Sequence, residues 1–259
     1  MTQADLAFAA DSSTRHLSCL ETGRSQPSRE MVVHLAEQLE VPLRDQNALL
    51  LAAGFAPAFQ ERSLAELAAA RQAIDQVLQA HKPYPAFAVD RHWNVILSNS
   101  ALPQLYEGCS TDLLRRPVNA VRLILHPLGM GPRIVNFVEW RAHVVTVLRQ
   151  QVETRADPAI QALLAEVLAY PAPAAGGVAP ATSEGPQRYA TPLQIATRLG
   201  TVSFLNTNMI FGTPTDVALS ELTVEMLFPA DDQTIAIVKS MVDEERAQAA
   251  SEARLQGAG

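Results

Sequence analysis

The 259-residue chain has little of what marks several classes of protein. Its two cysteines, Cys19 and Cys109, are too few for a disulfide framework and lie in no CxxC spacing, which favours a reducing cytoplasm. No apolar run approaches the roughly 18 residues that a membrane span requires. The residues after Met1 are polar, unlike those of a secretory signal. We therefore expect a cytoplasmic protein with no membrane partner.

Positive charge is also scarce, with 20 lysines and arginines against 27 acidic residues and a net charge of -7. A protein that coats nucleic acid through bulk charge would be basic, so that class is disfavoured. A small DNA-reading module inside a larger acidic protein stays compatible. The apolar share of 48% indicates folded domains, and the length suits one large or two modest ones.

The motifs of common enzymes are missing. The chain has no GK[ST] loop, no GxSxG elbow and no HExxH helix, and its histidines show no paired metal-ligand spacing. Gly129-Met130-Gly131 begins like a dinucleotide loop, but Ile134 stands where the third glycine is needed. We predict no catalytic residues, no cofactor and no metal. An enzyme remains an alternative only with His126 or Asp90 as acid or base in a buried cavity.

The first 60 residues are typical of short helices. Thr2 and Asp5 form a capping box, Ser13 can cap a second helix, and Gly23 ends that helix. Asp11 occupies the turn between these helices, at a position that favours a left-handed backbone. Two short helices joined by such a turn predict a helix-turn-helix.

Residues 61–82 are expected to form a connector helix, opened by a capping box of Ser63 and Glu66. Residues 83–245 then read as a hairpin, two amphipathic helices, a three-stranded antiparallel meander and a last helix, followed by a charged tail over 246–259. This order is that of PAS-type sensor domains. The predicted fold is therefore α+β, with an all-α domain before an antiparallel sheet with helices. In the last strand Leu222, Val224, Met226 and Phe228 alternate with Thr223 and Glu225, which predicts one apolar face.

Short segments along nearly the whole chain form one recognisable pattern. They are Ser13–Ser18, Glu21–Ser25, Pro27–Met31, Leu49–Pro57, Pro83–Pro85, Val89–Trp93, His126–Pro127, Ile134–Asn136, Phe211–Pro214, Glu221–Leu222 and Phe228–Asp231. The first of them are similar to the XRE (Cro/repressor-type) helix-turn-helix, and the longer pattern resembles the MmyB-like transcription regulators. The resemblance implies a prokaryotic regulator with a DNA-binding domain over 1–60 and a PAS-like domain over 83–245 that binds apolar small molecules such as fatty acids.

Carried over to this chain, the resemblance places the helix from Ser13 to Thr22 in the major groove of a double-stranded operator. Arg15 could then pair with a guanine, a contact worth roughly 1–3 kcal/mol of discrimination. The predicted DNA-binding residues are Gln3, Ser13, Thr14, Arg15, Ser18, Cys19, Arg24 and Arg29. Two copies would read half-sites about one helical turn apart, so we expect a homodimer.

Two features depart from the family pattern. The chain begins where the family's second helix begins. This predicts either that the true start of the protein lies upstream or that the gene product is a truncated copy. The first 60 residues hold four arginines against seven acidic residues, a net charge of -3 that is unusual for a DNA module. The alternative function is a lipid or small-molecule sensor that has lost sequence-specific DNA binding.

Apolar residues of the second region are candidates for a ligand pocket, although each could instead belong to the plain core. The candidate ligand-binding residues are Phe87, Trp93, Val95, Leu125, Phe137, Trp140, Phe204, Met209, Phe211 and Met226. A fatty-acid carboxylate would need a donor, for which Arg133 and Asn136 are the candidates. Ligand binding would act on the DNA-binding domain by reorienting the connector helix.

Overall fold

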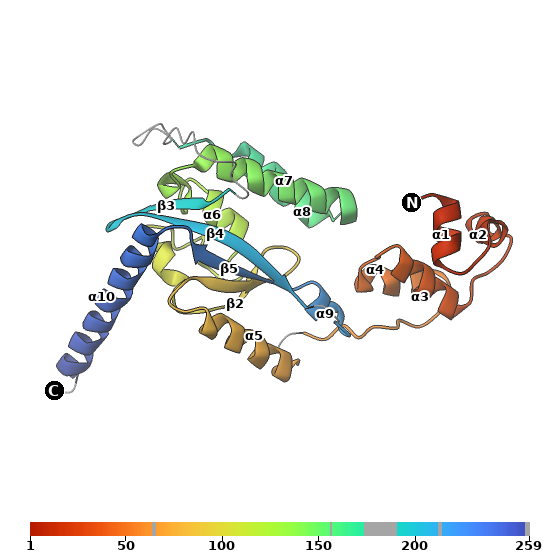
Figure 1. Ribbon diagram of the computed structural model, residues 1–259, viewed down its shortest axis with the longest axis horizontal. Coiled ribbons are helices and arrows are strands. Elements are labelled where there is room, and N and C mark those ends of the chain that lie inside the picture. The colour runs from red at the N-terminus through yellow and green to blue at the C-terminus, as the bar shows by residue number, and fades with distance from the viewer. Residues whose placement is uncertain (64–65, 156, 174–190, 212–213, 257–259) are drawn as a thin grey trace. The chain divides into compact units, whose positions relative to one another are not determined.

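The computed structural model describes residues 1–63, 66–155, 157–173, 191–211 and 214–256 (Figure 1). The chain forms two compact units. Unit 1 comprises Met1–Arg71 together with Phe211–Glu221, and unit 2 comprises Gln72–Ile210 and Leu222–Gly259. Within the described residues, no helix has both the length and the apolar character to cross a bilayer.

Unit 1 begins with four short helices. They are α1 (Gln3–Ala9), α2 (Thr14–Glu21), α3 (Arg29–Gln38) and α4 (Leu43–Ala52). The predicted caps are confirmed: Thr2 and Asp5 form a capping box before α1, and the Ser13 hydroxyl accepts from the backbone N–H of His16 at 3.1 Å. Leu17 and Leu50 are among the buried side chains of this helical core.

The turn between α1 and α2 has the predicted left-handed backbone. Asp11 has φ 44°, and the next residue, Ser12, donates its N–H to the Ala7 carbonyl at 2.8 Å. After α2, Gly23 also has a positive φ, of 69°. The turn at Asp11 lets α1 and α2 contact one another as a helix-turn-helix requires, and Gly23 turns the chain away after α2.

A distant segment of the chain completes unit 1. It contains α9 (Val217–Ser220), which lies between strands β4 and β5 in sequence. Glu221 accepts from Arg44 of α4 twice, Nε to Oε1 at 2.8 Å and Nη2 to Oε2 at 3.0 Å. The fully buried Asp216 accepts from Arg62 Nε at 3.0 Å. No local pattern in the sequence indicates that this segment belongs with the N-terminal helices.

Unit 2 contains a five-stranded antiparallel sheet in the order β2-β1-β5-β4-β3. Its strands are β1 (Ala86–Val89), β2 (Val95–Ser98), β3 (Leu193–Thr197), β4 (Gly200–Ile210) and β5 (Thr223–Pro229). The predicted hairpin is β1–β2 and the predicted meander is β3–β4–β5. The predicted α+β fold class is confirmed.

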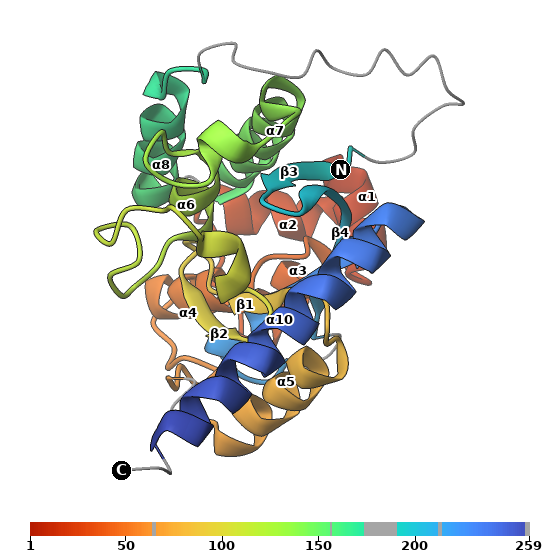
Figure 2. The ribbon, with the colours of Figure 1, turned by 90° about the vertical axis from the view of Figure 1, so that its left-hand side faces the viewer.

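The helices of unit 2 are α5 (Ala68–Ala80), which begins in unit 1, α6 (Ala120–Leu125), α7 (Phe137–Arg155), α8 (Pro158–Ala169) and α10 (Asp232–Gln256), with short 3-10 turns at Pro103–Tyr106 and Gly131–Arg133. Helices α7 and α8 run side by side (Figure 2). The sequence also predicts Asp157 as the cap of α8 and Asp231 or Asp232 as the cap of α10. Asp157 accepts from Ala159 N at 2.9 Å, and Asp231 accepts from Thr234 N at 2.7 Å.

Three predicted segments differ from the structure or lie partly outside it. The connector expected over 61–82 is helical only from Ala68, and residues 64–65 lie outside the described chain. The tail expected from 246 continues α10 to Gln256, because no proline or glycine interrupts the helix before that residue. The stretch of residues 170–188 is rich in proline, alanine and glycine and is predicted to be a loop, but it lies outside the described residues from 174 onward.

Strand β5 is covered on both of its faces. On one face Val224 is fully buried, together with its neighbours Ala86 and Ala88 of β1. The chain just after α5 reaches this face, where the ring of His81 lies 4.6 Å from that of Phe228. The opposite face of β5, which carries Glu225, lines a pocket described below. Alternation along β5 therefore does not separate a buried face from a solvent face.

Candidate ligand pocket and DNA-reading helix

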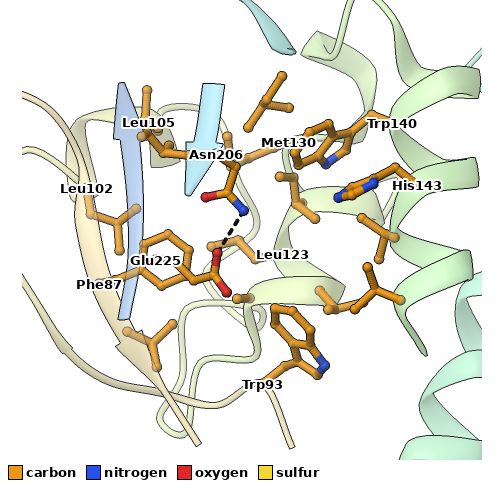
Figure 3. A pocket seen from close by; sticks show the side chains of 18 of the residues that line it. Phe87, Trp93, Leu102, Leu105, Leu123, Met130, Trp140, His143, Asn206 and Glu225 are labelled. Carbon is orange, nitrogen blue, oxygen red and sulfur yellow. Dashed lines mark hydrogen bonds between the residues drawn. The ribbon is translucent and has the colours of Figure 1, made fainter. Parts of the chain in front are cut away.

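A pocket of unit 2 lies between the sheet and helices α6 and α7 (Figure 3). The space between its walls, the solvent at its open mouth included, is about 770 Å³. Its lining is mostly apolar. The lining residues are Phe87, Trp93, Val95, Leu102, Leu105, Tyr106, Ala120, Val121, Leu123, Ile124, Met130, Trp140, His143, Val144, Val147, Leu193, Asn206, Glu225 and Leu227.

Trp93 is fixed at the pocket by the turn of the β1–β2 hairpin. It has φ 67°, a left-handed backbone that is rare for a bulky residue. Asp90 holds this turn, because its Oδ1 accepts the backbone N–H groups of His92 at 2.9 Å and Asn94 at 2.8 Å. The indole N–H of Trp93 donates to Gln151 Oε1 of α7 at 2.9 Å. The hairpin and α7 are thus joined beside the cavity.

Two polar side chains of the sheet enter the apolar lining. Asn206 of β4 donates from Nδ2 to Oε2 of Glu225 of β5 at 2.7 Å. Burial raises the pKa of the Glu225 carboxyl, and the bond from Asn206 opposes that rise. The side chain is only 1% exposed. Neither residue was a predicted site residue.

Four of the predicted ligand-binding residues line the pocket: Phe87, Trp93, Val95 and Trp140. Leu125, Phe137 and Phe204 are buried in the adjoining core instead. Met209 and Met226 lie on the opposite face of the sheet from Glu225, as their pairing with Val224 and Ala86 requires. Phe211 belongs to unit 1.

The two predicted carboxylate anchors do not line the pocket, which corrects their expected placement. The Arg133 guanidinium donates to the Leu105 carbonyl and lies 3.8 Å from the Cys109 sulfur. The Asn136 amide donates to the Pro192 carbonyl at 2.8 Å and accepts from Gln194 N at 3.1 Å. Both side chains hold backbone segments in place.

The residues of the enzyme alternative also have structural partners. Asp90 holds the hairpin turn, and His126 Nδ1 accepts the backbone N–H of Leu128 at 2.9 Å. Neither residue lines the pocket.

The candidate DNA-reading surface is α2 with the turns beside it. Thr14, Arg15 and Ser18 are exposed on α2, and Cys19 is half-buried. Ser13 caps this helix through its hydroxyl.

Flanking α2, Arg24 and Arg29 are exposed. Among the residues that the structure describes, neither they nor Arg15 form an ion pair. Gln3 donates to Glu21 Oε2 at 2.7 Å, so its amide joins α1 to the end of α2. These three guanidinium groups are therefore available to an external anion, whereas the Gln3 amide already has a partner.

A helix-turn-helix unit joined to a sheet unit with an apolar pocket defines a class of protein, the ligand-responsive DNA-binding regulators. Residues 70–241 match the family model of the MmyB-like transcription regulator ligand binding domain, and residues 1–46 match a helix-turn-helix model. The chain belongs to the MmyB-like transcription regulators, which confirms the resemblance seen in the sequence. No curated protein is similar enough to match the chain.

Proposed function

We propose that this regulator reads its operator with α2, as a homodimer, and changes its DNA affinity when an apolar molecule such as a fatty acid or a related lipid fills the unit 2 pocket. The observation that carries the proposal is the pairing, in one chain, of a helix-turn-helix with unpaired arginines and a largely apolar cavity.

On the DNA side, Thr14, Arg15 and Ser18 share the exposed surface of α2. Ser18 is four positions from Thr14 and three from Arg15, so it shares a helix face with each, from which side chains can reach neighbouring base edges in the major groove. Arg15 would read a guanine through two parallel hydrogen bonds. Arg24 and Arg29 lie beyond the end of α2, where phosphate contacts would set the register of the helix without reading sequence.

On the ligand side, aromatic and aliphatic side chains from β1, β2, α6 and α7 surround the cavity. Such a lining favours an alkyl or acyl chain, because its apolar surface is buried on binding. This burial contributes about 25 cal/mol per Å², before the entropy lost on binding is subtracted. Met130 adds a flexible side chain that adapts to chains of different shape.

The route between the two sites is proposed to run through β4 and β5. These strands carry Asn206 and Glu225 into the pocket, and the chain that joins them belongs to unit 1, where Arg44 holds Glu221. A ligand that shifts the strand ends would therefore act on the helical unit. The connector α5 is a second covalent link.

Two measurements test the proposal. Lipids extracted from the purified protein are identified by mass spectrometry, and fluorescence anisotropy follows binding to the DNA upstream of the protein's own gene, with and without the extract. We expect Arg15→Ala to weaken binding about tenfold or more. The control Arg149→Ala, an exposed arginine of α7, should have little effect.

The two alternatives give different outcomes. A sensor that has lost DNA recognition would carry the lipid and show no preference for its upstream DNA over unrelated DNA. A protein that reads the operator and carries no apolar cargo would leave the DNA-binding half of the proposal intact and contradict the ligand half.

A further inference from the structure

The pocket has a polar end within its apolar wall. Glu225 and Asn206 extend from the sheet into the cavity, and Leu123 and Trp93 lie across from them (Figure 3). Glu225 is 1% exposed, and its carboxyl receives one hydrogen bond, from Asn206 at 2.7 Å. This bond uses one carboxyl oxygen and one amide group, so each side chain keeps a second polar atom.

Those remaining atoms have no partner among the described residues. They are Oε1 of Glu225 and Oδ1 of Asn206, and on the helix side of the same pocket Nε1 of Trp140 is also unpartnered. A buried polar atom without a hydrogen bond loses its bond to water and gains no other, which is unfavourable. Three such atoms around one cavity indicate that the polar group of a ligand is their missing partner.

The charges around the cavity restrict what that group can be. Of the described residues that line it, none is a lysine or an arginine. Tyr106 stays neutral because burial raises its pKa. His143 of α7 is the remaining titratable group besides Glu225 itself. An ionised carboxylate would therefore enter a pocket without a permanent cation and lie near an acidic side chain, which is unfavourable in a poorly solvated site.

Resting on the ligand-responsive function proposed above, we propose that the pocket selects an apolar chain that ends in a hydrogen-bond donor, a hydroxyl or amino group, over one that ends in an ionised carboxylate. An amino group donates to both Glu225 Oε1 and Asn206 Oδ1, and a hydroxyl donates to one of them. The Trp140 N–H is left for an acceptor atom of the same ligand. Among the apolar ligands proposed above, this selection favours long-chain alcohols and amines over an ionised fatty acid.

The chain provides its own optical probe for this test. It has two tryptophans, Trp93 and Trp140, and both line the pocket. Intrinsic fluorescence of the full-length protein therefore reports on the occupancy of the cavity. The probes are decanol, decylamine and decanoate, which share one chain length and differ in the head group, titrated near neutral pH into protein freed of bound lipid.

We expect wild-type protein to bind decanol and decylamine about tenfold more tightly than decanoate, a difference of about 1.4 kcal/mol. Glu225→Leu should bring the three affinities to within about threefold of one another. Glu225→Gln should keep decanol binding and lower the affinity for decylamine about tenfold, because the ionisable group is gone. The control Val147→Ala, on the apolar wall, should weaken all three probes alike.

Several outcomes would overturn the inference. Tightest binding of decanoate to wild-type protein, or an unchanged order of affinities in Glu225→Leu, contradicts the head-group selection and leaves the apolar-ligand proposal standing. If Glu225→Leu does not fold, an unchanged ratio of amine to carboxylate affinity in Glu225→Gln has the same meaning. No fluorescence response to any probe contradicts both proposals.

Discussion

Burial on β5 keeps the Glu225 carboxyl out of water, and the pKa of this group is raised above its ordinary value of 4.5 for that reason. The folded protein then holds this proton more tightly than the unfolded chain does. As the pH rises from 4.5 through the folded-state pKa, the unfolded chain releases the proton first, so this group lowers the free energy of unfolding progressively.

Replacing the Glu225 carboxyl with an amide removes this pH-dependent loss of stability. We expect Glu225→Gln to raise the free energy of unfolding near neutral pH by about 1–2 kcal/mol, with the gain shrinking toward zero as the pH falls to about 4.5. Urea unfolding of lipid-free protein over a series of pH values measures this gain in the free energy of unfolding. Glu153→Gln, at an exposed position of α7, is the control. A gain that is independent of pH would contradict the assigned cause.

Glu225 also marks the limit of prediction for single residues. The alternation of β5 placed the apolar side chains inward and Glu225 outward, but this central strand has both faces covered, so the pattern could not assign the face. A lone acidic residue between Val224 and Met226 was the available signal. The structure places Trp93 and Trp140 in the pocket wall, because large aromatics in a small domain concentrate in its core, and their contact with a ligand stays a prediction.

Among the elements, the α1–α2 turn depends on an unfavourable residue. Asp11 has φ 44°, a conformation that glycine adopts without steric penalty. We expect Asp11→Gly to stabilise unit 1 by about 0.5–1 kcal/mol, after the greater freedom of glycine in the unfolded chain is subtracted from the relief of strain. Thermal unfolding followed by circular dichroism measures the change.

Gly23 is the matched control for this turn. Its φ is 69° and an added Cβ would meet no atom within 4 Å, so only the backbone conformation opposes a side chain. Gly23→Ala should destabilise unit 1 by about 1 kcal/mol. If the two variants shift stability in the same direction, the backbone conformation is not what governs these turns.

The elements themselves were largely predictable because their signals are local. Asp157 followed by Pro158, and Thr2 with Asp5, specify helix starts within a few residues, and the structure confirms both. The association of residues 211–221 with the N-terminal helices has no local signal. It depends on contacts such as that of Arg44 with Glu221, which lie far apart in the sequence.

For the whole molecule, the chain crosses between the units more than once. Unit 1 receives the β4–β5 connection, and α5 begins in unit 1 and continues into unit 2. A single flexible linker would let each unit move independently. Here the strands that carry the polar end of the pocket are covalently continuous with a segment that is bonded to α4. The coupling between ligand binding and DNA binding can therefore be tested by changing this β4–β5 connection.

Arg44→Met tests that segment, because it removes the paired hydrogen bonds to Glu221 and keeps most of the side-chain volume. We expect faster hydrogen exchange over residues 216–221, and a ligand-induced change in DNA affinity at least about threefold smaller than in wild-type protein. Ligand-free DNA affinity, and ligand affinity measured by tryptophan fluorescence, should stay within about twofold of wild type. Arg115→Met, which breaks an exposed ion pair with Asp112 in unit 2, should leave the response intact. A full ligand response in Arg44→Met would mean that the signal travels through α5 instead.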